Sequence, residues 1–577
     1  FLKPFNINNC FDRMLLQFAL GNTEILSMLR VFERAGIYGH NKKLNDESDA
    51  FKKKQESKMR RALVVLQSYD QAKLSHKDRL SLSIMLWFIQ DSVDGQRYSY
   101  HNYPINQLFG VQNQFPTFMV TLHQIKNKRD AHHYNVRLSK VGRKFAQVIE
   151  GLKIRAAMGI IPPTFVFAKV IDEMADFIKV PIEENILHTN LIAKIDKFAN
   201  ISHLEKEKLL KVNIEALKDV VYPAYRDLAV YLSELKDKSS SEDGVWKLPQ
   251  GDDYYQYLLG HYTTTQLSAE EIHDIGLREV GRIHVEMSEI FGTLGYTGKS
   301  SIELINQLSA ERRFMYEDTA EERRQVIVDY QEMINSIEQK ISHLFYRQPK
   351  AKVVVDRIPE FKEKTAPTAY YYPPALDGSR PGIFSVNLMK MPIKFHMQTL
   401  AFHEAVPGHH FQLAIQQELK GVPMFRKFLP FTAYAEGWAL YAEKLAYEEK
   451  LFSDKYAELG YLASELFRAV RLVVDTGLHH KRWTREEAIQ YMTDNSGSSR
   501  SNIEAEIERY IVMPGQATAY KIGELEIVRL RKHAKDKLVA AFDIREFHNV
   551  VLKNGSVPLT ILAQLVDRYI EANIAKK

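Results

Sequence analysis

The sequence predicts a mainly α-helical fold with a small β element. Glycine (27) and proline (20) are sparse among the 577 residues. Long stretches repeat apolar residues at the spacing of a buried helix face, most clearly Ala269–Gly292, Glu321–Phe345 and Ala457–His479. Strand-like alternation is rare, so we expect helices to form most of the core.

The β element is expected between residues 352 and 387. Three short segments have the character of strands: Lys352–Asp356, Tyr370–Tyr372 and Ile383–Val386. The last two flank residues 373–382, which are rich in proline and glycine. This arrangement predicts a ribbon or hairpin with a long loop.

The chain is long enough for several domains. At roughly 100–200 residues per domain, its 577 residues allow about two to four. The polar run from Lys236 to Gly244 is the clearest candidate for a linker. We therefore expect an N-terminal helical region at 1–240 and a second region at 245–577, which also fit two lobes of one domain.

Charge and composition exclude some classes of protein. The 78 Lys and Arg residues nearly balance the 72 Asp and Glu residues, and no dense basic run is interleaved with aromatics. A nucleic-acid partner is therefore not expected. No stretch approaches the roughly 18 apolar residues that a membrane span needs. Cys10 is the only cysteine, so no internal disulfide can form.

The chain begins at Phe1 and not at methionine. A cleaved secretion signal, a lipoprotein leader or trimming of the chain would each explain this start. We expect an extracytoplasmic protein, periplasmic or lipid-anchored after leader removal, in preference to a cytoplasmic one.

The strongest chemical signal is a histidine cluster. His403, His409 and His410 fall within eight residues, and His403-Glu404 is the only His-Glu pair in the chain. Neutral imidazoles bind zinc well, and a glutamate beside the first ligand can reach a water activated by the metal. An apolar stripe on the flanking residues predicts a buried helix, where the Glu404 carboxylate is costly without a partner. A histidine cluster with satisfied hydrogen bonds and no metal is the alternative.

The spacing differs from the usual His-Glu-x-x-His helix, because Pro407 stands where the second histidine belongs. Proline lacks an N–H and Gly408 follows it, so the helix is expected to bulge or kink here. A bulge would carry His409 back to the face of His403. His410 lies on that face in a regular helix, but about 10.5 Å along the axis. We prefer His409 as the second ligand and keep His410 as the alternative.

A third ligand is expected on a downstream helix, since catalytic zinc commonly binds two histidines, one glutamate and water. Phe431–Glu448 is apolar on nearly every face, which predicts a buried helix. Within it, Glu436 and Glu443 are seven residues apart on one face, and both need partners. A structural ion pair between Glu436 and a buried Arg or Lys is the alternative.

These segments resemble a known family. The run from Phe402 to Gln412 is similar to the bacterial "domain of unknown function 885" proteins, relatives of the gluzincin metallopeptidases. The resemblance covers at least residues 250–577, and more faintly the helical region from about 130. It includes the segments EEIHDIGLREVGRIHVEM (270–287), DGSRPGIFSVN (377–387), AEGWALYAE (435–443), RLVVDTGLH (471–479) and ERYIVMPGQATAYKIG (508–523). It implies a largely helical, gluzincin-like zinc-peptidase fold with a deep cleft and a Zn2+ cofactor.

The resemblance also suggests the ligands. Glu436 in Ala-Glu-Gly-Trp-Ala is similar to the third zinc ligand in the Asn-Glu-Gly-Phe-Ala segment of gluzincin aminopeptidases, which leaves Glu443 to orient a histidine N–H. Thimet-type oligopeptidases carry His-Glu-Phe-Gly-His, and matching its Gly-His to Gly408-His409 makes this chain a version with two inserted residues. Dipeptidyl-peptidase III similarly widens its motif by one residue. The match to Gly408-His409 favours His409 as the second ligand.

Several residues are candidates for supporting roles in catalysis. Tyr510, Tyr520 and His479 are candidate donors to the oxyanion of a tetrahedral intermediate, with Asp475 orienting His479. Either tyrosine is as readily a core aromatic residue. Arg471, Asp475 and His479 are spaced four apart and also fit a structural ion pair with a capped histidine.

The ribbon before the zinc helix contains two candidate substrate-binding residues, Tyr372 and Asn387. In zinc peptidases of this kind an edge strand at this position pairs with an extended peptide. A solvent-facing hairpin is the alternative.

The expected function is zinc-dependent hydrolysis of peptide bonds in small peptides by the region 245–577. Glu404 would act as general base and then as general acid. Restriction to small peptides follows from the family resemblance, since the cleft of a large helical shell excludes folded proteins. The alternatives are a zinc hydrolase of a non-peptide amide or ester, and a non-catalytic helical binding protein.

Overall fold

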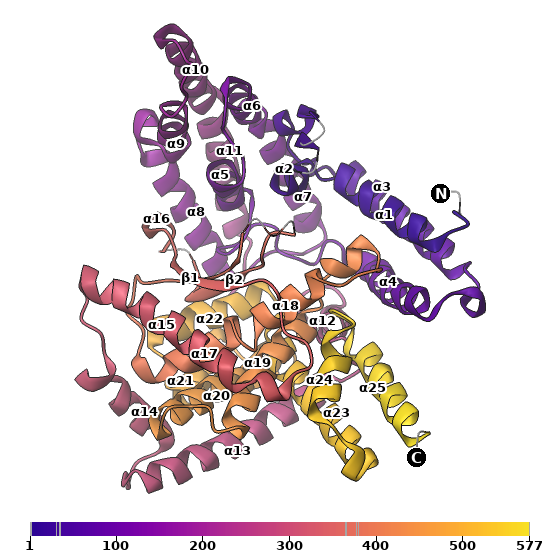
Figure 1. The fold of residues 1–577 in the computed structure, drawn as a ribbon. Helices are drawn as coiled ribbons and strands as arrows, with labels where there is room; N and C mark the ends of the chain where they lie inside the picture. The colour runs from indigo at the N-terminus through magenta and orange to yellow at the C-terminus, as the bar shows by residue number, and fades with distance from the viewer. Residues whose placement is uncertain are drawn as a thin grey trace. The chain divides into compact units, whose positions relative to one another are not determined.

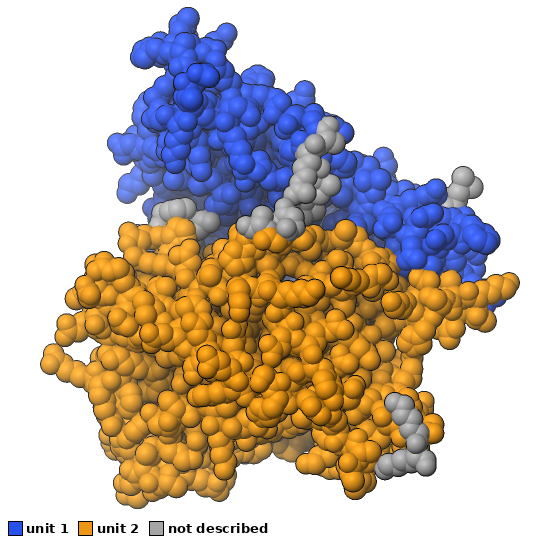
Figure 2. Space-filling view, viewed as in Figure 1, with its two compact units in different colours: residues 1–70, 88–243, 247–250 blue, residues 71–87, 244–246, 251–577 orange. Residues whose placement is uncertain are grey.

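The helices of this protein fall into two units. The computed structural model describes residues 3–30, 32–33, 36–363, 366–376, 378 and 380–575. Unit 1 comprises residues 1–70, 88–243 and 247–250, and unit 2 comprises residues 71–87, 244–246 and 251–577 (Figure 2). The division into regions 1–240 and 245–577 stays a prediction.

Unit 1 is built from helices, and several of them begin at side-chain caps (Figure 1). Ser48 caps α3, and Ser202 forms a reciprocal capping box with Glu205 at the start of α10. Phe145 and Tyr225 are buried in its core. The helices of unit 1 are α1 (Ile7–Leu20), α2 (Thr23–Leu29), α3 (Asp49–Gln67), α5 (Val111–Thr121), α6 (Lys128–Leu138), α7 (Val141–Ala157), α8 (Thr164–Lys179), α9 (Ile186–Ile195), α10 (His203–Ala216) and α11 (Tyr222–Lys236).

Unit 2 contains most of the remaining helices, and α4 (His76–Asp94) has residues in both units. Its two longest helices, α13 and α20, pack against each other. The helices of unit 2 are α12 (Gly251–Thr263), α13 (Ala269–Thr293), α14 (Ser301–Ser309), α15 (Ala320–Lys340), α16 (Glu360–Glu363), α17 (Lys394–Glu404), α18 (His409–Gln417), α19 (Thr432–Glu448), α20 (Lys455–His479), α21 (Arg485–Ser496), α22 (Arg500–Val512), α23 (Ala519–Leu538), α24 (Ile544–Leu552) and α25 (Leu559–Ile574).

A three-stranded sheet in unit 2 consists of β1 (Val353–Arg357), β2 (Ala369–Tyr372) and β3 (Gly382–Val386). β3 is central and pairs in parallel with β1 and antiparallel with β2. The antiparallel pair matches the expected ribbon, and each strand lies within one residue of its expected position. Asp377 and Ser379, from the family-like segment 377–387, lie outside the described residues.

The helix α19 packs against α17, α18, α20 and α23 and carries the most deeply buried aromatic side chains of this region. Trp438 is fully buried, as are the tyrosines on either side of it. Two glycines allow α19 and α23 to touch, because a Cβ on Gly437 would lie 2.6 Å from the Cα of Gly523. The prediction of a buried helix at this position is confirmed, and its charged side chains are therefore surrounded by protein.

The mainly helical prediction is confirmed, with one difference in extent. The stretch expected to continue to Phe345 ends as α15 at Lys340, and a short 3-10 helix, Ser342–Leu344, follows. After this short helix, Phe345 stacks on His548 of α24, at 4.6 Å between ring centroids. Among the described residues, no helix is both long enough and apolar enough to cross a membrane.

Candidate metal centre

The histidine segment forms two helices joined by a tight connection, where a single distorted helix was expected. α17 ends at Glu404 and α18 begins at His409. Pro407 in the connection has no N–H to continue the helical hydrogen bonds. Gly408 folds back onto the end of α17, where a Cβ would lie 1.9 Å from the carbonyl oxygen of His403. Only glycine fits this position, and the return of the chain brings His409 beside His403.

A buried tryptophan holds this connection in place. The indole N–H of Trp438 donates a hydrogen bond to the carbonyl oxygen of Pro407, 2.8 Å away. Trp438 lies on α19, two residues after Glu436, so the same helix that supplies the carboxylate also positions the connection. A fully buried indole N–H needs an acceptor, and this requirement is the sequence signal for the contact.

Three side chains converge at the connection. Nε2 of His403 and Nε2 of His409 lie 3.6 and 3.3 Å from Oε2 of Glu436. The two imidazole rings are nearly perpendicular, with centroids 4.8 Å apart. In the part of the chain that the structure describes, these residues form the one group of three or more whose ligand atoms lie within 4.8 Å of one another. The protein thus contains a His-His-Glu group that can hold a metal ion.

The spacing of these atoms fits a tetrahedral ion. Donors bound at about 2.0–2.2 Å from such an ion lie about 3.3–3.6 Å from each other. The two distances to Glu436 fall in this range, and two imidazoles with one carboxylate form the ligand set typical of catalytic zinc. Nδ1 of His409 has no partner among the described residues, so hydrogen bonding does not account for the whole cluster.

Glu443 orients the first histidine. Its Oε1 lies 2.6 Å from Nδ1 of His403, and its other oxygen accepts a hydrogen bond from Ser464 at 3.3 Å. With the proton on Nδ1 donated to this buried carboxylate, the lone pair of Nε2 faces Glu436. Such a carboxylate contact fixes the tautomer and raises the basicity of an imidazole ligand.

The pKa shifts in the cluster show that its buried carboxylates require nearby positive charge. Burial opposes the charged form of His403, but hydrogen bonds to Glu436 and Glu443 raise its pKa to about 9. Burial likewise favours neutral Glu436, yet the neighbouring histidines lower the pKa of its carboxyl. The buried carboxylates therefore require positive charge between them, which either protons or a metal ion can supply.

Glu404 differs from Glu436 and Glu443 in having no hydrogen-bond partner among the described residues. It is 8% exposed, and the described residues offer its carboxylate no hydrogen bond or ion pair. Burial and the charge on Glu404 raise the pKa of Tyr330, a buried residue of α15. A carboxylate without a protein partner beside the histidine cluster can exchange protons with a water molecule or a substrate.

His410, the alternative second ligand, lies outside the cluster. Its Nδ1 lies 2.8 Å from the hydroxyl of Tyr371, and its Nε2 lies 3.1 Å from the carbonyl oxygen of Ala351. Burial lowers the pKa of this imidazole to about 4, which keeps it neutral. His410 thus connects α18 to the strand region with both ring nitrogens, and neither nitrogen faces Glu436.

The two candidate tyrosines differ in their surroundings. Tyr510 is fully buried, and its hydroxyl donates to Glu506 and accepts from Nε of Arg471 at 2.9 Å. Tyr520 keeps part of its surface exposed. Burial and the charge on Glu436 raise the pKa of Tyr520, and a hydrogen bond between its side chain and Gln516 opposes this shift.

The expected contact between Asp475 and His479 is not made. Both nitrogens of His479 are engaged, Nδ1 with the N–H of Val245 at 3.1 Å and Nε2 with the carbonyl of Tyr510 at 3.0 Å. Asp475 instead accepts from the Tyr255 hydroxyl at 2.6 Å and from the backbone N–H of residue 515 at 2.9 Å. Both side chains are fully buried in these contacts and connect segments of the core.

The two candidates from the ribbon also differ. The amide of Asn387 donates to the carbonyls of Glu363, Ala366 and Pro367, so it binds the end of α16 and the residues just before β2. Tyr372 is 52% exposed at the end of β2. Since β2 pairs with β3 along one side, Tyr372 lies on an edge strand of the described sheet.

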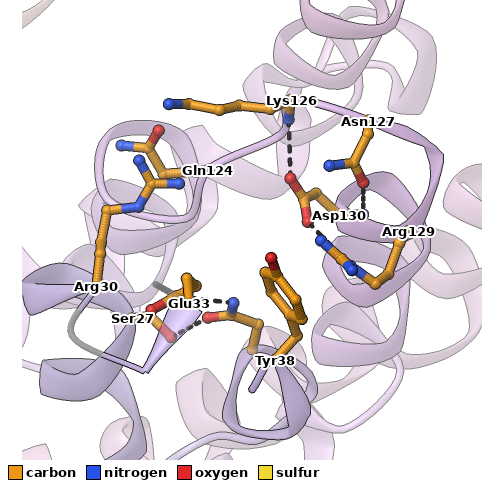
Figure 3. A pocket seen from close by; sticks show the side chains of 10 residues that line it. Ser27, Arg30, Glu33, Tyr38, Gln124, Lys126, Asn127, Arg129 and Asp130 are labelled. Carbon is orange, nitrogen blue, oxygen red and sulfur yellow. Dashed lines mark hydrogen bonds and ion pairs between the residues drawn. The ribbon is translucent and has the colours of Figure 1, made fainter. Parts of the chain in front are cut away.

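A second polar site lies in unit 1, and it has a different character. A pocket of about 150 Å³ is lined by side chains that include Arg30, Glu33, Tyr38, Lys126 and Asp130 (Figure 3). Glu33 accepts from a neighbouring histidine and asparagine, both at 3.0 Å, and Asp130 accepts from the N–H of Lys126 at 3.1 Å. Asp130 is thus hydrogen-bonded by the protein, whereas Glu33 uses only Oε1, and its buried Oε2 has no hydrogen-bond partner among the described residues.

The fold and the His-His-Glu group define a large helical protein with a candidate metal centre in the core of one unit. Residues 32–566 match the family described as "Bacterial protein of unknown function (DUF885)", and the chain belongs to this family. No curated protein matches it.

Solved structures support the fold. A protein from Colwellia psychrerythraea described as a lipoprotein is 33% identical, with 96% of this chain and 99% of that chain covered and a TM-score of 0.89. A protein of unknown function from Shewanella oneidensis, also described as a lipoprotein, is 19% identical over 97% and 98% of the two chains, with a TM-score of 0.74. An oligoendopeptidase F from Bacillus anthracis is 12% identical over 90% and 95%, with a TM-score of 0.29, which is too low to show a common fold.

Proposed function

We propose that this protein is a zinc-dependent peptidase that hydrolyses peptide bonds in small peptides. The observation that carries the proposal is the pairing of two features at one place. The ligand atoms of His403, His409 and Glu436 lie within 4.8 Å of one another, and the unpartnered carboxylate of Glu404 follows His403 directly in the chain.

The residues of the cluster divide into ligands and supports. His403, His409 and Glu436 would hold the ion, and Glu443 would keep His403 in the required tautomer. Zinc, when bound, polarises a carbonyl group and lowers the pKa of a water molecule. The spacing near 3.3–3.6 Å and the His-His-Glu donor set support zinc over the hard cations Mg2+ and Ca2+, which prefer oxygen ligands.

Glu404 would move the protons of the reaction. Its carboxylate accepts a proton from the attacking water and delivers it to the leaving amine, a role worth roughly 10²- to 10⁴-fold in rate. Tyr520 remains the candidate donor to the developing oxyanion, because it lies on α23, which packs against the helix that carries Glu436. An extended peptide would add to the side of β2 opposite β3, beside Tyr372.

We also propose that the protein works outside the cytoplasm. The two similar structures with high TM-scores are both described as lipoproteins, and the chain covers nearly their whole length. Detection of the native protein in fractionated cells tests this location, and recovery with the cytoplasmic fraction would contradict it.

The direct test combines metal analysis with peptide digestion. We expect one zinc per chain in the native protein, loss of zinc in His403→Ala, and retention of zinc without hydrolysis in Glu404→Gln. His533→Ala is the control, since this partly exposed histidine pairs with Asp567 away from the cluster. A native protein that binds no zinc would refute the proposal and leave a non-catalytic binding protein. Zinc binding with cleavage only of non-peptide amides or esters would shift the substrate class.

A further inference from the structure

Two arginines beside the candidate metal centre share one carboxylate. Arg471 on α20 and Arg509 on α22 both donate to Oε2 of Glu506, at 3.0 and 2.9 Å. Arg471 is 8% exposed and Glu506 is also largely buried. Asp475, one turn further along α20, has its pKa raised to about 7 by burial and faces other groups. The group of Arg471, Glu506 and Arg509 therefore carries one excess positive charge, and buried charge is costly unless something pairs with it.

Tyr520 connects Arg471 of this pair with the helices of the metal cluster. The guanidinium carbon of Arg471 is 4.7 Å from the ring centroid of Tyr520. Tyr520 lies one turn before Gly523, which touches α19 at Gly437, the neighbour of Glu436. Tyr520 thus contacts the guanidinium and lies on the helix that packs against the Glu436 segment of α19, and the charge on Glu436 contributes to its raised pKa.

The guanidinium of Arg471 is held in place but not saturated. Its Nε and Nη2 donate to Tyr510 and Glu506, and its face lies over the rings of Phe467 and Tyr520. Nη1 has no hydrogen-bond partner among the described residues. An immobilised guanidinium edge with free donors is the geometry that recognises a carboxylate.

We infer that Arg471 binds a carboxylate of the peptide substrate and so positions the scissile bond at the metal centre. The inference rests on the proposed peptidase function and names its substrate class. The carboxylate is either the C-terminus of the peptide or an acidic side chain near the cleaved bond. The first source implies release of short C-terminal fragments, and the second implies internal cleavage beside Asp or Glu.

A binding measurement tests carboxylate recognition separately from peptide hydrolysis. Glu404→Gln protein is titrated calorimetrically with a short peptide as the free acid, as its C-terminal amide, and as variants with and without one Glu side chain. We expect removal of the recognised carboxylate to weaken binding about 10- to 100-fold. Preference for the free acid over the amide identifies the C-terminus, and preference for the Glu-containing peptide identifies the side chain. Equal binding of all four peptides, or no binding, would overturn the inference even if the protein hydrolyses peptides.

Two variants locate the recognition. Arg471→Lys in the Glu404→Gln background is expected to remove most of the preference, with zinc content unchanged. The matched control is Arg531→Lys, because Arg531, like Arg471, lies over a tyrosine ring and pairs with a glutamate. Arg531 is on α23, about 16 Å along the helix axis from Tyr520. In catalytically active protein, Arg471→Lys should raise KM far more than it lowers kcat. If folded Arg471→Lys protein keeps the preference for the peptide carboxylate, Arg471 is not the residue that binds it. The titration of Glu404→Gln protein with Arg471 intact tests the preference itself, whether or not the Arg471→Lys variant folds.

Discussion

Buried polar groups in the two units illustrate opposite uses of the same chemistry. In unit 1, Arg137 is fully buried, and its three nitrogens donate to Lys43, His123 and Ser27 at 2.9, 2.6 and 2.6 Å. In unit 2, Glu404 is nearly as buried and has no such partner among the described residues. A buried charge whose donors are engaged supports the fold, whereas a carboxylate without a protein partner stays available for function.

Replacing Glu404 by Gln should have the largest effect on activity and little effect on folding. We expect kcat/KM for a cleaved peptide to fall by about 10²- to 10⁴-fold, because the amide cannot accept a proton. Thermal stability should stay within about 1 kcal/mol, since no protein contact is lost. Peptide hydrolysis and calorimetry measure the two effects. A marked loss of stability would mean that Glu404 is a structural residue like Arg137.

Arg137→Met should show the reverse pattern. Removal of the guanidinium leaves the Lys43 carbonyl, His123 and Ser27 without their donor, at a cost of about 3–5 kcal/mol in the free energy of unfolding. Chemical denaturation measures this loss. The amount of zinc bound per folded chain should not change. A lower zinc content in folded Arg137→Met protein would contradict the view that Arg137 serves only the fold of unit 1.

Glu443→Gln tests the support beneath the metal centre. A neutral amide holds the Nδ1 proton of His403 more weakly and lowers the basicity of Nε2, so zinc affinity should fall by about 10- to 100-fold. Competition with a chelator measures the affinity. An unchanged affinity would show that Glu443 only fills space in α19.

Trp438→Phe should have the smallest effect. The Pro407 carbonyl loses its donor, which costs about 1–3 kcal/mol of stability. Because the connection before His409 is then less restrained, zinc affinity should also fall, by several-fold. Trp246→Phe is the control, since its indole N–H has no hydrogen bond among the described residues. Equal effects of both substitutions on zinc affinity would remove the special role assigned to Trp438.

Residue periodicity predicted which segments form helices and strands, but it did not predict how these elements pack together. The three strands lie within one residue of their expected positions because alternation and turn residues are local signals. The parallel pairing of β1 with β3 depends on contacts across the chain, and no local pattern contains it. The same holds for His479, whose nitrogens bond to Val245 and Tyr510, far away in sequence.

The sequence by itself determined the helical class, the buried helix at Phe431–Glu448 and the residue types that point to zinc. These follow from hydrophobic spacing and from the chemistry of His and Glu side chains. Only the tertiary structure decided which histidine faces Glu436. Gly408 returns the chain against the carbonyl of His403, and Trp438 holds that turn. His410, one residue away from His409, is therefore directed to the strand region. The physical reason is that a close contact between backbone segments depends on every neighbour that packs around it, and such neighbours come from distant parts of the chain.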